Sequence, residues 1–194
     1  MRLKGQWPVV GLVLILLSFG LSSCNRNRSV EAAREDKASA TPVEMDFMMK
    51  ASQGNMAEIE MARAAMAKTD NTDVKDFANM IQTDHSRNLK DVVVLMKDSG
   101  ASQPTSLPAA MRQDIDRMNT LTGPEFDREF VNMMVADHQK AVELFRDQET
   151  TVTNTDVKDY VEGTLPELEM HLDKAQQLQS KLFSAPNRQS RLVR

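Results

Sequence analysis

The chain has 194 residues, and it combines few glycines, prolines and aromatic residues with 14 methionines, which is typical of a helical protein. Its formal net charge of −4 excludes the strongly basic proteins that bind nucleic acid through phosphate contacts. The length allows one domain with a sizeable hydrophobic core.

The first 23 residues have the pattern of a bacterial signal peptide. Arg2 and Lys4 precede an apolar run that is too short to cross a bilayer. The residues after this run, Leu-Ser-Ser-Cys at 21–24, resemble a lipobox, in which the cysteine is lipidated after cleavage. We therefore expect residues 1–23 to be a lipoprotein signal peptide and Cys24 to anchor the mature protein in a membrane. An ordinary secretory peptide with a chance cysteine is the alternative.

The chain after the signal peptide divides into three parts. From the cysteine onward the formal charge is −6, because the signal peptide holds two of the basic residues and no acidic one. Residues 24–42 are polar and charged, so we expect a lipidated cysteine followed by a flexible tether. Residues 43–183 form the expected domain, and residues 184–194 form a short basic tail.

Within the domain, apolar residues recur at steps of three and four, which predicts four long helices and a short one. Gly100 is a suitable left-handed cap after the second helix, and Pro166 predicts a kink or local break in the last. The expected fold class is all-α, a four-helix bundle whose long connection carries the short helix and permits a ferritin-like crossover. The predicted helices span residues 43–68, 73–99, 107–121, 124–149 and 156–183.

Two of these helices begin with nearly identical heptapeptides. Asn-Thr-Asp-Val-Lys-Asp-Phe at residues 71–77 returns at residues 154–160 with tyrosine in the last position. We expect Thr72 and Thr155 to be the N-caps, with the following aspartates favoured at the positive end of each helix. Chance similarity between two helix starts is the alternative.

A second repeat contains two of the only three histidines. Phe-Ala-Asn-Met-Ile-Gln-Thr-Asp-His at residues 77–85 matches Phe-Val-Asn-Met-Met-Val-Ala-Asp-His at residues 130–138 in Phe, Asn, Met, Asp and His. Both histidines, like His171, lie on the apolar face of a helix at spacings of three or four. Glu58 lies on the apolar face of the first helix. All four side chains are near the midpoints of their helices, so we expect them at one level of the bundle.

This level predicts a transition-metal site, and its imidazoles suit iron, zinc or copper. The alternative is a structural polar layer, in which buried histidines hydrogen-bond to carboxylates without a metal. The methionines are expected to fill the core, with Cu(I) ligation by Met134 as the alternative. The expected metal ligands are Glu58, His85, His138 and His171. The expected hydrogen-bond partners of these ligands are Asp84, Asp137 and Glu167.

Seven sequence features occur in order along the chain. They are the lipobox, Glu58, Asp84-His85, Phe126-Asp127, Asp137-His138, Leu165-Pro166 and His171-Leu172. Together they resemble the bacterial family called domain of unknown function 4142, over about residues 43–183. The resemblance implies a ferritin-like fold and an outer membrane lipoprotein that faces the periplasm, with no established activity. Residues 126–134 also resemble, locally, a second and metal-associated four-helix family.

The site differs from that of the di-iron ferritins, whose centre resembles two glutamates combined with two Glu-x-x-His motifs. The residues three positions before the histidines here are Gln82, Val135 and Leu168, and none is a carboxylate. Ferroxidase chemistry is therefore not expected, and no catalytic residue is assigned. The sequence also lacks a nucleophile triad, a phosphate loop and a nucleotide fingerprint.

The functional expectation is a lipid-anchored protein of the cell envelope whose helical bundle binds a transition metal. Its expected partner is the membrane, through the lipid, and nucleic acid is not expected. A non-catalytic structural or interaction lipoprotein, whose core histidines only pack and hydrogen-bond, is the alternative. A metal-dependent oxidoreductase is a third interpretation, which the absence of paired carboxylates disfavours.

Overall fold

The structure is a computed structural model that describes residues 39–184, and this part of the chain contains helices and no strand. Each predicted helix is present, and its ends differ from the prediction by two residues or fewer. The expected signal peptide, Cys24 and nearly all of the expected tether and basic tail lie outside the described residues. The helices are α2 (Pro42–Lys68), α3 (Thr72–Asp98), α4 (Ala109–Asn119), α5 (Gly123–Thr151) and α6 (Thr155–Ser184).

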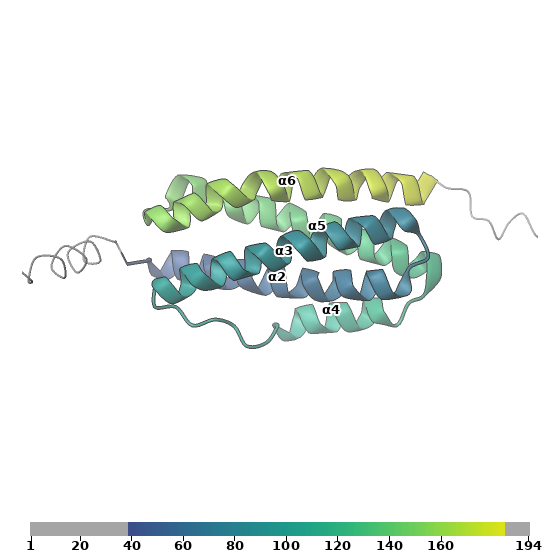
Figure 1. Cartoon of the computed structure of the whole chain (residues 1–194), viewed down its shortest axis with the longest axis horizontal. Coiled ribbons are helices and arrows are strands. Elements are labelled where there is room, and N and C mark those ends of the chain that lie inside the picture. The colour runs from purple at the N-terminus through teal and green to yellow at the C-terminus, as the bar shows by residue number, and fades with distance from the viewer. Residues whose placement is uncertain (1–38, 185–194) are drawn as a thin grey trace, which may run out of the picture. The chain divides into compact units, whose positions relative to one another are not determined.

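Two helical hairpins make up the bundle (Figure 1). Helices α2 and α3 form the first, and α5 and α6 form the second, each joined by a short turn. The connection between the hairpins, with α4 in it, returns the chain to the end where α3 begins, so α5 runs parallel to α3 (Figure 1). This is the ferritin-like crossover that the long connection predicted.

The repeated heptapeptides do start two helices, but through a different residue from the one expected. The side-chain oxygen of Asn71 accepts the backbone N–H groups of Asp73 and Val74 at 3.0 and 3.4 Å. Asn154 does the same at the start of α6, at 3.0 and 3.1 Å. Thr72 and Thr155 were wrongly expected to cap, because each is already the first helical residue and the asparagine before it reaches the exposed N–H groups. The N-caps are therefore asparagines.

Gly100 ends a helix as predicted, whereas Pro166 does not interrupt one. Gly100 has a φ of 74° and ends α3 in a Schellman motif, with Ala101 N–H donating to the carbonyl of Met96 at 2.8 Å and Gly100 N–H to that of Lys97 at 3.1 Å. Helix α6 runs without a break through Pro166, which faces solvent. The expected local break at this proline is therefore wrong.

The hydrophobic core has two parts, separated along the bundle. One part contains Phe77 and Phe130, and the other contains Phe47 and Phe145. In each of α3, α5 and α6 the two parts occupy opposite halves of the helix, and the histidine lies between them. The middle of the bundle is therefore polar and the two ends are apolar.

Glu44 connects α2 to the turn between α5 and α6. Its Oε2 accepts the backbone N–H of Thr41 at 2.6 Å, and Thr41 in turn caps α2 in a capping box. Its Oε1 accepts the backbone N–H groups of Thr153 and Asn154, both at 2.8 Å. Burial by itself raises the pKa of Glu44, but these N–H donors outweigh burial and lower the pKa to about 2.

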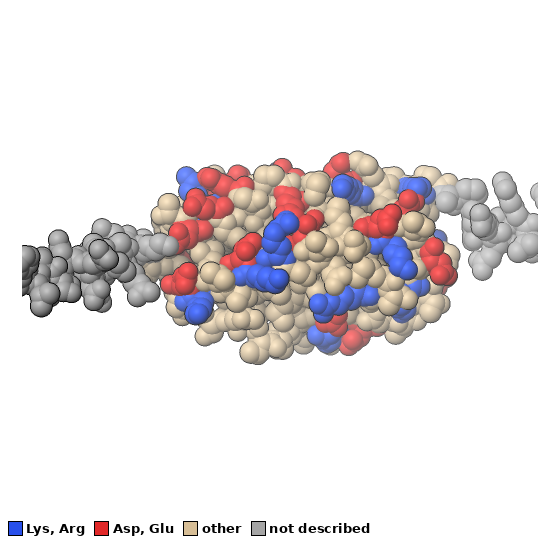
Figure 2. Space-filling view, viewed as in Figure 1, with Lys and Arg blue, Asp and Glu red and all other residues tan. Residues whose placement is uncertain are grey.

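The surface mixes charges of both signs. Acidic and basic side chains are interspersed over the face shown in Figure 2, which agrees with ion pairs such as Arg87 with Glu167 and Lys181 with Asp73. Among the residues that the structure describes, no helix combines the length and the hydrophobicity that crossing a membrane requires.

Candidate metal centre

Three histidine rings from three helices form a triangle in the middle of the bundle. His85 of α3, His138 of α5 and His171 of α6 are buried, with exposed fractions of 4%, 0% and 1%. Each pair of ring centroids is 5.3 Å apart. The plane of the His138 ring makes angles of 81° with the His85 ring and 75° with the His171 ring. The planes of the His85 and His171 rings differ by 31°. The structure thus brings together all three histidines of the chain.

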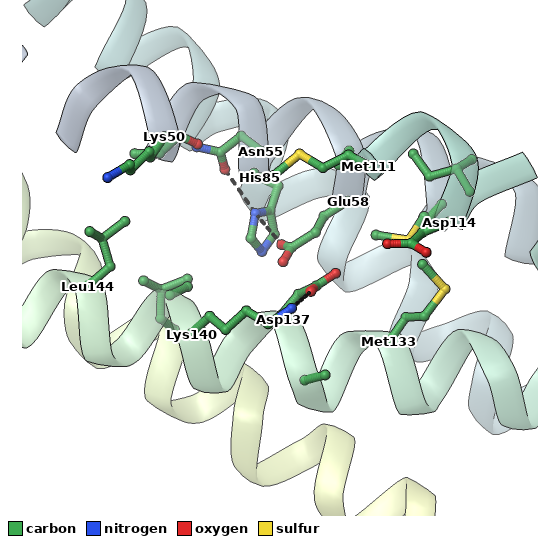
Figure 3. A pocket seen from close by; sticks show the side chains of 18 of the residues that line it. Lys50, Asn55, Glu58, His85, Met111, Asp114, Met133, Asp137, Lys140 and Leu144 are labelled. Atoms are coloured by element: carbon green, nitrogen blue, oxygen red, sulfur yellow. Dashed lines mark hydrogen bonds and ion pairs between the residues drawn. The ribbon is translucent and has the colours of Figure 1, made fainter. Parts of the chain in front are cut away.

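Oxygen atoms surround Nδ1 of His85 and determine which ring nitrogen carries the proton. Nδ1 lies 2.8 Å from Oδ1 of Asn55 and 2.9 Å from Oε2 of Glu58 (Figure 3). The amide group of Asn55 is oriented by its NH₂, which donates to the carbonyl of Ala51 at 2.9 Å and to Oδ1 of Asn88 at 2.6 Å. Because both neighbours are acceptors, Nδ1 carries a hydrogen, and in the neutral ring the lone pair is therefore on Nε2.

His138 is held in the same tautomer by its own helix. Its Nδ1 lies 3.0 Å from the carbonyl oxygen of Met134, one turn earlier in α5, and 3.6 Å from Oε1 of Glu58. A carbonyl oxygen can only accept a hydrogen bond, so Nδ1 is the donor. The lone pair of His138 is therefore on Nε2.

His171 has the opposite tautomer. Its Nε2 lies 3.1 Å from Oδ2 of Asp84, across the interface between α3 and α6. The carboxylate accepts, so Nε2 donates and Nδ1 keeps the lone pair. Each histidine therefore points its N–H outward to an oxygen on a neighbouring group.

The three nitrogens that keep a lone pair are buried and have no hydrogen-bond partner. They are Nε2 of His85, Nε2 of His138 and Nδ1 of His171. Each ring can offer one nitrogen so that the three lie within 4.8 Å of one another. Buried polar atoms nearly always have a partner, and a neutral imidazole whose N–H is held by an oxygen is the form that ligates metals. The cluster could therefore hold a metal ion.

Glu58, the fourth expected ligand, lies beside the N–H groups of two histidines rather than beside the free nitrogens. Its Oε2 lies 2.9 Å from Nδ1 of His85 and shares the proton on that nitrogen with Oδ1 of Asn55 at 2.8 Å. Burial by itself raises the pKa of Glu58, but the adjacent His138 and His85 outweigh burial and lower the pKa to about 2. The residue is therefore a buried carboxylate anion.

The histidines differ in how readily they accept a second proton. Burial lowers the pKa of each ring, but at His85 the carboxylate of Glu58 outweighs burial and raises the pKa. At His138 burial prevails over Glu58, and the pKa is lowered. Burial, followed by the neighbouring His85 and His138, lowers the pKa of His171 to about 4. At neutral pH the cluster therefore contains at least two neutral imidazoles.

A comparison with known families assigns the chain. A family model described as Domain of unknown function (DUF4142) matches residues 29–178. The chain belongs to the DUF4142 family. The family resemblance of the sequence motifs is thereby confirmed, while a comparison with curated proteins finds no match.

Two solved structures have a similar fold. One is a DUF305 fragment from Deinococcus radiodurans, with a TM-score of 0.67 and 14% identity, covering 74% of this chain and 99% of that one. The other is a predicted secreted DUF305 protein from Streptomyces coelicolor, with a TM-score of 0.64 and 14% identity, covering 75% and 95%. These similarities place the DUF4142 domain among helical proteins of the same architecture.

The three acidic residues expected to support the histidines have different roles in this DUF4142 domain. Asp84 hydrogen-bonds to the ring of the α6 histidine and also lies 3.4 Å from Arg87. Glu167 pairs with the same arginine at 2.5 Å. Asp137 pairs with Lys140 at 3.1 Å, and burial raises its pKa. Of the three, Asp84 is the one whose hydrogen bond to a histidine the structure shows.

Asn55 is a functional candidate that the sequence analysis missed. It belongs to a buried network in which Asn88 accepts from the hydroxyl of Tyr160 at 2.7 Å and donates to Thr164 at 3.0 Å. A signal was present, because Asn55 precedes Glu58 by three residues and so shares its helix face. Asparagine is common in helices as a solvent-facing residue, and its position on this apolar face was the only distinguishing mark.

The methionines of the domain mainly fill the core. Those with essentially no exposure include Met48, Met61, Met96, Met118 and Met134. The hydrogen bond between Met134 and His138 uses the backbone carbonyl of the methionine. The core-filling interpretation of these methionines therefore agrees with the structure.

Proposed function

We propose that this domain binds one divalent transition-metal ion through His85 Nε2, His138 Nε2 and His171 Nδ1. The observation that supports the proposal is the set of three buried, unpartnered ring nitrogens, one from each helix. A structural polar layer would account for the outward N–H contacts. It would leave three buried acceptors without partners at one place, which is costly in a protein interior.

The charge around the cluster favours a divalent ion. Two carboxylates, Glu58 and Asp84, accept ring N–H groups of the cluster and together supply two negative charges. Such carboxylates orient metal-binding imidazoles and increase their basicity. We therefore assign Glu58 to this supporting role and not to direct ligation, which differs from the sequence expectation. Zinc, copper and iron are the ions that three imidazoles suit, and three protein ligands leave a further coordination position open.

Metal content of the purified chain from residue 25 onward, which retains the whole described bundle, tests the proposal. After incubation with zinc, copper(II) or iron(II) and gel filtration, elemental analysis should give one metal ion per chain for at least one of them. A hundredfold excess of free metal over the dissociation constant should stabilise the fold by about 2.7 kcal/mol, or roughly 5–10 °C in melting temperature.

Substitutions separate ligation from packing. His138→Asn keeps a donor near the Met134 carbonyl but has no imidazole lone pair, so it should lose the metal and the thermal shift. Asp137→Asn, which alters a neighbouring carboxylate paired with Lys140, should retain both. No metal at stoichiometric level, or an unchanged shift in His138→Asn, would refute the metal proposal and leave the structural layer.

We further propose that the protein is anchored in the cell envelope, at the outer membrane, through a lipid on Cys24. The support is the order of cationic residues, apolar run and lipobox in the first 24 residues. Cys24→Ser should move the protein from the membrane fraction to the soluble fraction of cells. Equal membrane association of the variant would contradict the anchor.

A further inference from the structure

A cavity of about 520 Å³ opens between α2 and α5 (Figure 3). These two helices pack less closely than either hairpin pair, and α4 lies against both of them at one end. The volume is within the range of pockets that bind small molecules. The cavity adjoins the metal centre, because Glu58 and His85 line it, but it does not include the other two histidines.

Apolar and small side chains make up most of the cavity wall. Gly54 of α2 faces this space, and a Cβ atom added there would meet nothing within 4 Å. The helix therefore leaves room that an ordinary side chain would fill. The main apolar wall residues are Ala57, Met61, Met111, Met133, Leu144 and Leu168.

The charged residues that line the cavity toward solvent are already paired. Lys50 binds Asp46 at 2.6 Å, and Lys140 binds Asp137 at 3.1 Å. Both lysines are more than half exposed. Because each cation has a carboxylate partner, these lysines offer little net attraction to an anionic ligand.

The inner end of the cavity presents a buried carboxylate. Glu58 is 4% exposed, and its carboxylate, which lies 2.9 Å from Nδ1 of His85, has further lone pairs that can accept a donor. Figure 3 shows this carboxylate beside His85 at the cavity. A ligand that fits must therefore bring a hydrogen-bond donor to this end, and a ligand with a carboxylate there would be repelled.

We propose that this cavity binds a small aliphatic molecule with one hydroxyl or amine head, which donates a hydrogen bond to Glu58 while the apolar body packs between α2 and α5. The inference goes beyond metal binding and does not depend on it, since it uses the cavity and Glu58 and not the free ring nitrogens.

Calorimetric titration of the purified protein, with and without added metal, tests the proposal with 1-butanol, 1-hexanol, hexylamine and hexanoate as probes. Affinity should rise about fourfold per methylene, the equivalent of about 0.8 kcal/mol. Hexanol and hexylamine should bind at least tenfold more tightly than hexanoate. Absence of binding by both donor probes, or hexanoate binding as tightly as hexanol, would overturn the proposal.

Variants locate the binding. Gly54→Phe should fill the cavity and weaken hexanol binding at least tenfold, and Gly54→Leu serves if the larger ring prevents folding. Gly163→Phe is the matched control, because Gly163 also has open space but lies in α6 outside this cavity, and it should bind hexanol within twofold of the native protein. Native binding by Gly54→Phe and Gly54→Leu would contradict the site. A failure of the metal proposal would appear separately, as hexanol binding in a protein that retains no metal.

Discussion

At the scale of single residues, the direction of each ring N–H matters as much as the presence of the histidine. The sequence placed all three histidines on inward faces, because helical periodicity determines facing. It could not indicate which nitrogen points to the centre, since that depends on oxygens from other helices and from the backbone. Asn55 shows this dependence, because it lies on α2 and holds the proton of His85 on α3.

Asn55→Leu should weaken metal binding about 10-fold, because His85 then loses the closer of the two acceptors that hold its Nδ1 proton. A competition titration against a chromophoric chelator measures the dissociation constant. Tyr160→Phe removes the far end of the same network without touching the histidine, and its affinity should stay within twofold of native. Equal weakening in both variants would show that network rigidity, and not the His85 tautomer, controls affinity.

Glu44 gives a pH dependence of known sign. Its pKa in the folded protein is about 2, below its ordinary value near 4.5. The stabilisation is therefore complete above about pH 4.5 and is lost as the pH falls toward 2. Glu44→Gln should reduce the unfolding free energy by about 2 kcal/mol at pH 7 and by much less near pH 2.5. Urea unfolding of the native protein and the variant at both pH values measures this difference in unfolding free energy. An equal loss at about pH 7 and about pH 2.5 would contradict a role for the ionised carboxylate in these hydrogen bonds.

At the scale of helices, sequence patterns are sufficient to predict that each helix exists and how long it is. Spacing of apolar residues predicts every described helix, and Gly100 predicts the left-handed cap that ends α3. The N-caps lie one residue before the predicted ones, at Asn71 instead of Thr72 and at Asn154 instead of Thr155. The geometry of the first turn decides which side chain caps, and the sequence alone does not show this geometry. Pro166 does not break α6, since buried residues on both sides of it keep the helix packed and continuous.

Pro166→Ala should stabilise the domain by about 1–3 kcal/mol. Proline in a helix interior lacks the N–H donor and crowds the preceding turn, whereas alanine restores the hydrogen bond at this exposed position. The midpoint of urea unfolding measures the gain. Gln176→Ala, an exposed substitution on the same helix, should change stability by less than about 0.5 kcal/mol. A loss of stability in Pro166→Ala would mean that the helix requires the proline geometry.

At the scale of the whole molecule, the polar level divides one core into two. The sequence predicted a polar level at mid-height because helix midpoints do not depend on helix direction. It did not predict the cavity, since the spacing between α2 and α5 follows from how the second hairpin and α4 pack on the first. Buried ionic groups are weak stabilisers, so this level is expected to add little to the free energy of folding.

Replacing Glu58, His85, His138 and His171 together by leucine should join the two cores and stabilise the metal-free protein by about 1–4 kcal/mol. His85→Leu alone should have the opposite effect, with a loss of about 3 kcal/mol, because Glu58 then remains as a buried anion with less compensation. Chemical unfolding of metal-free samples compares the two. Destabilisation of the fourfold variant would instead favour a structural role for the histidines.

The crossover topology has a consequence for the integrity of the chain. His85 belongs to the first hairpin, whereas His138 and His171 belong to the second, and the segment that joins the hairpins is exposed at Ser102 and Gln103. An ion shared by the three rings would act as a removable cross-link between the two halves of the polypeptide. If a protease site introduced at Ser102 is cut, the fragments should co-elute in gel filtration with metal and separate more readily once a chelator removes it.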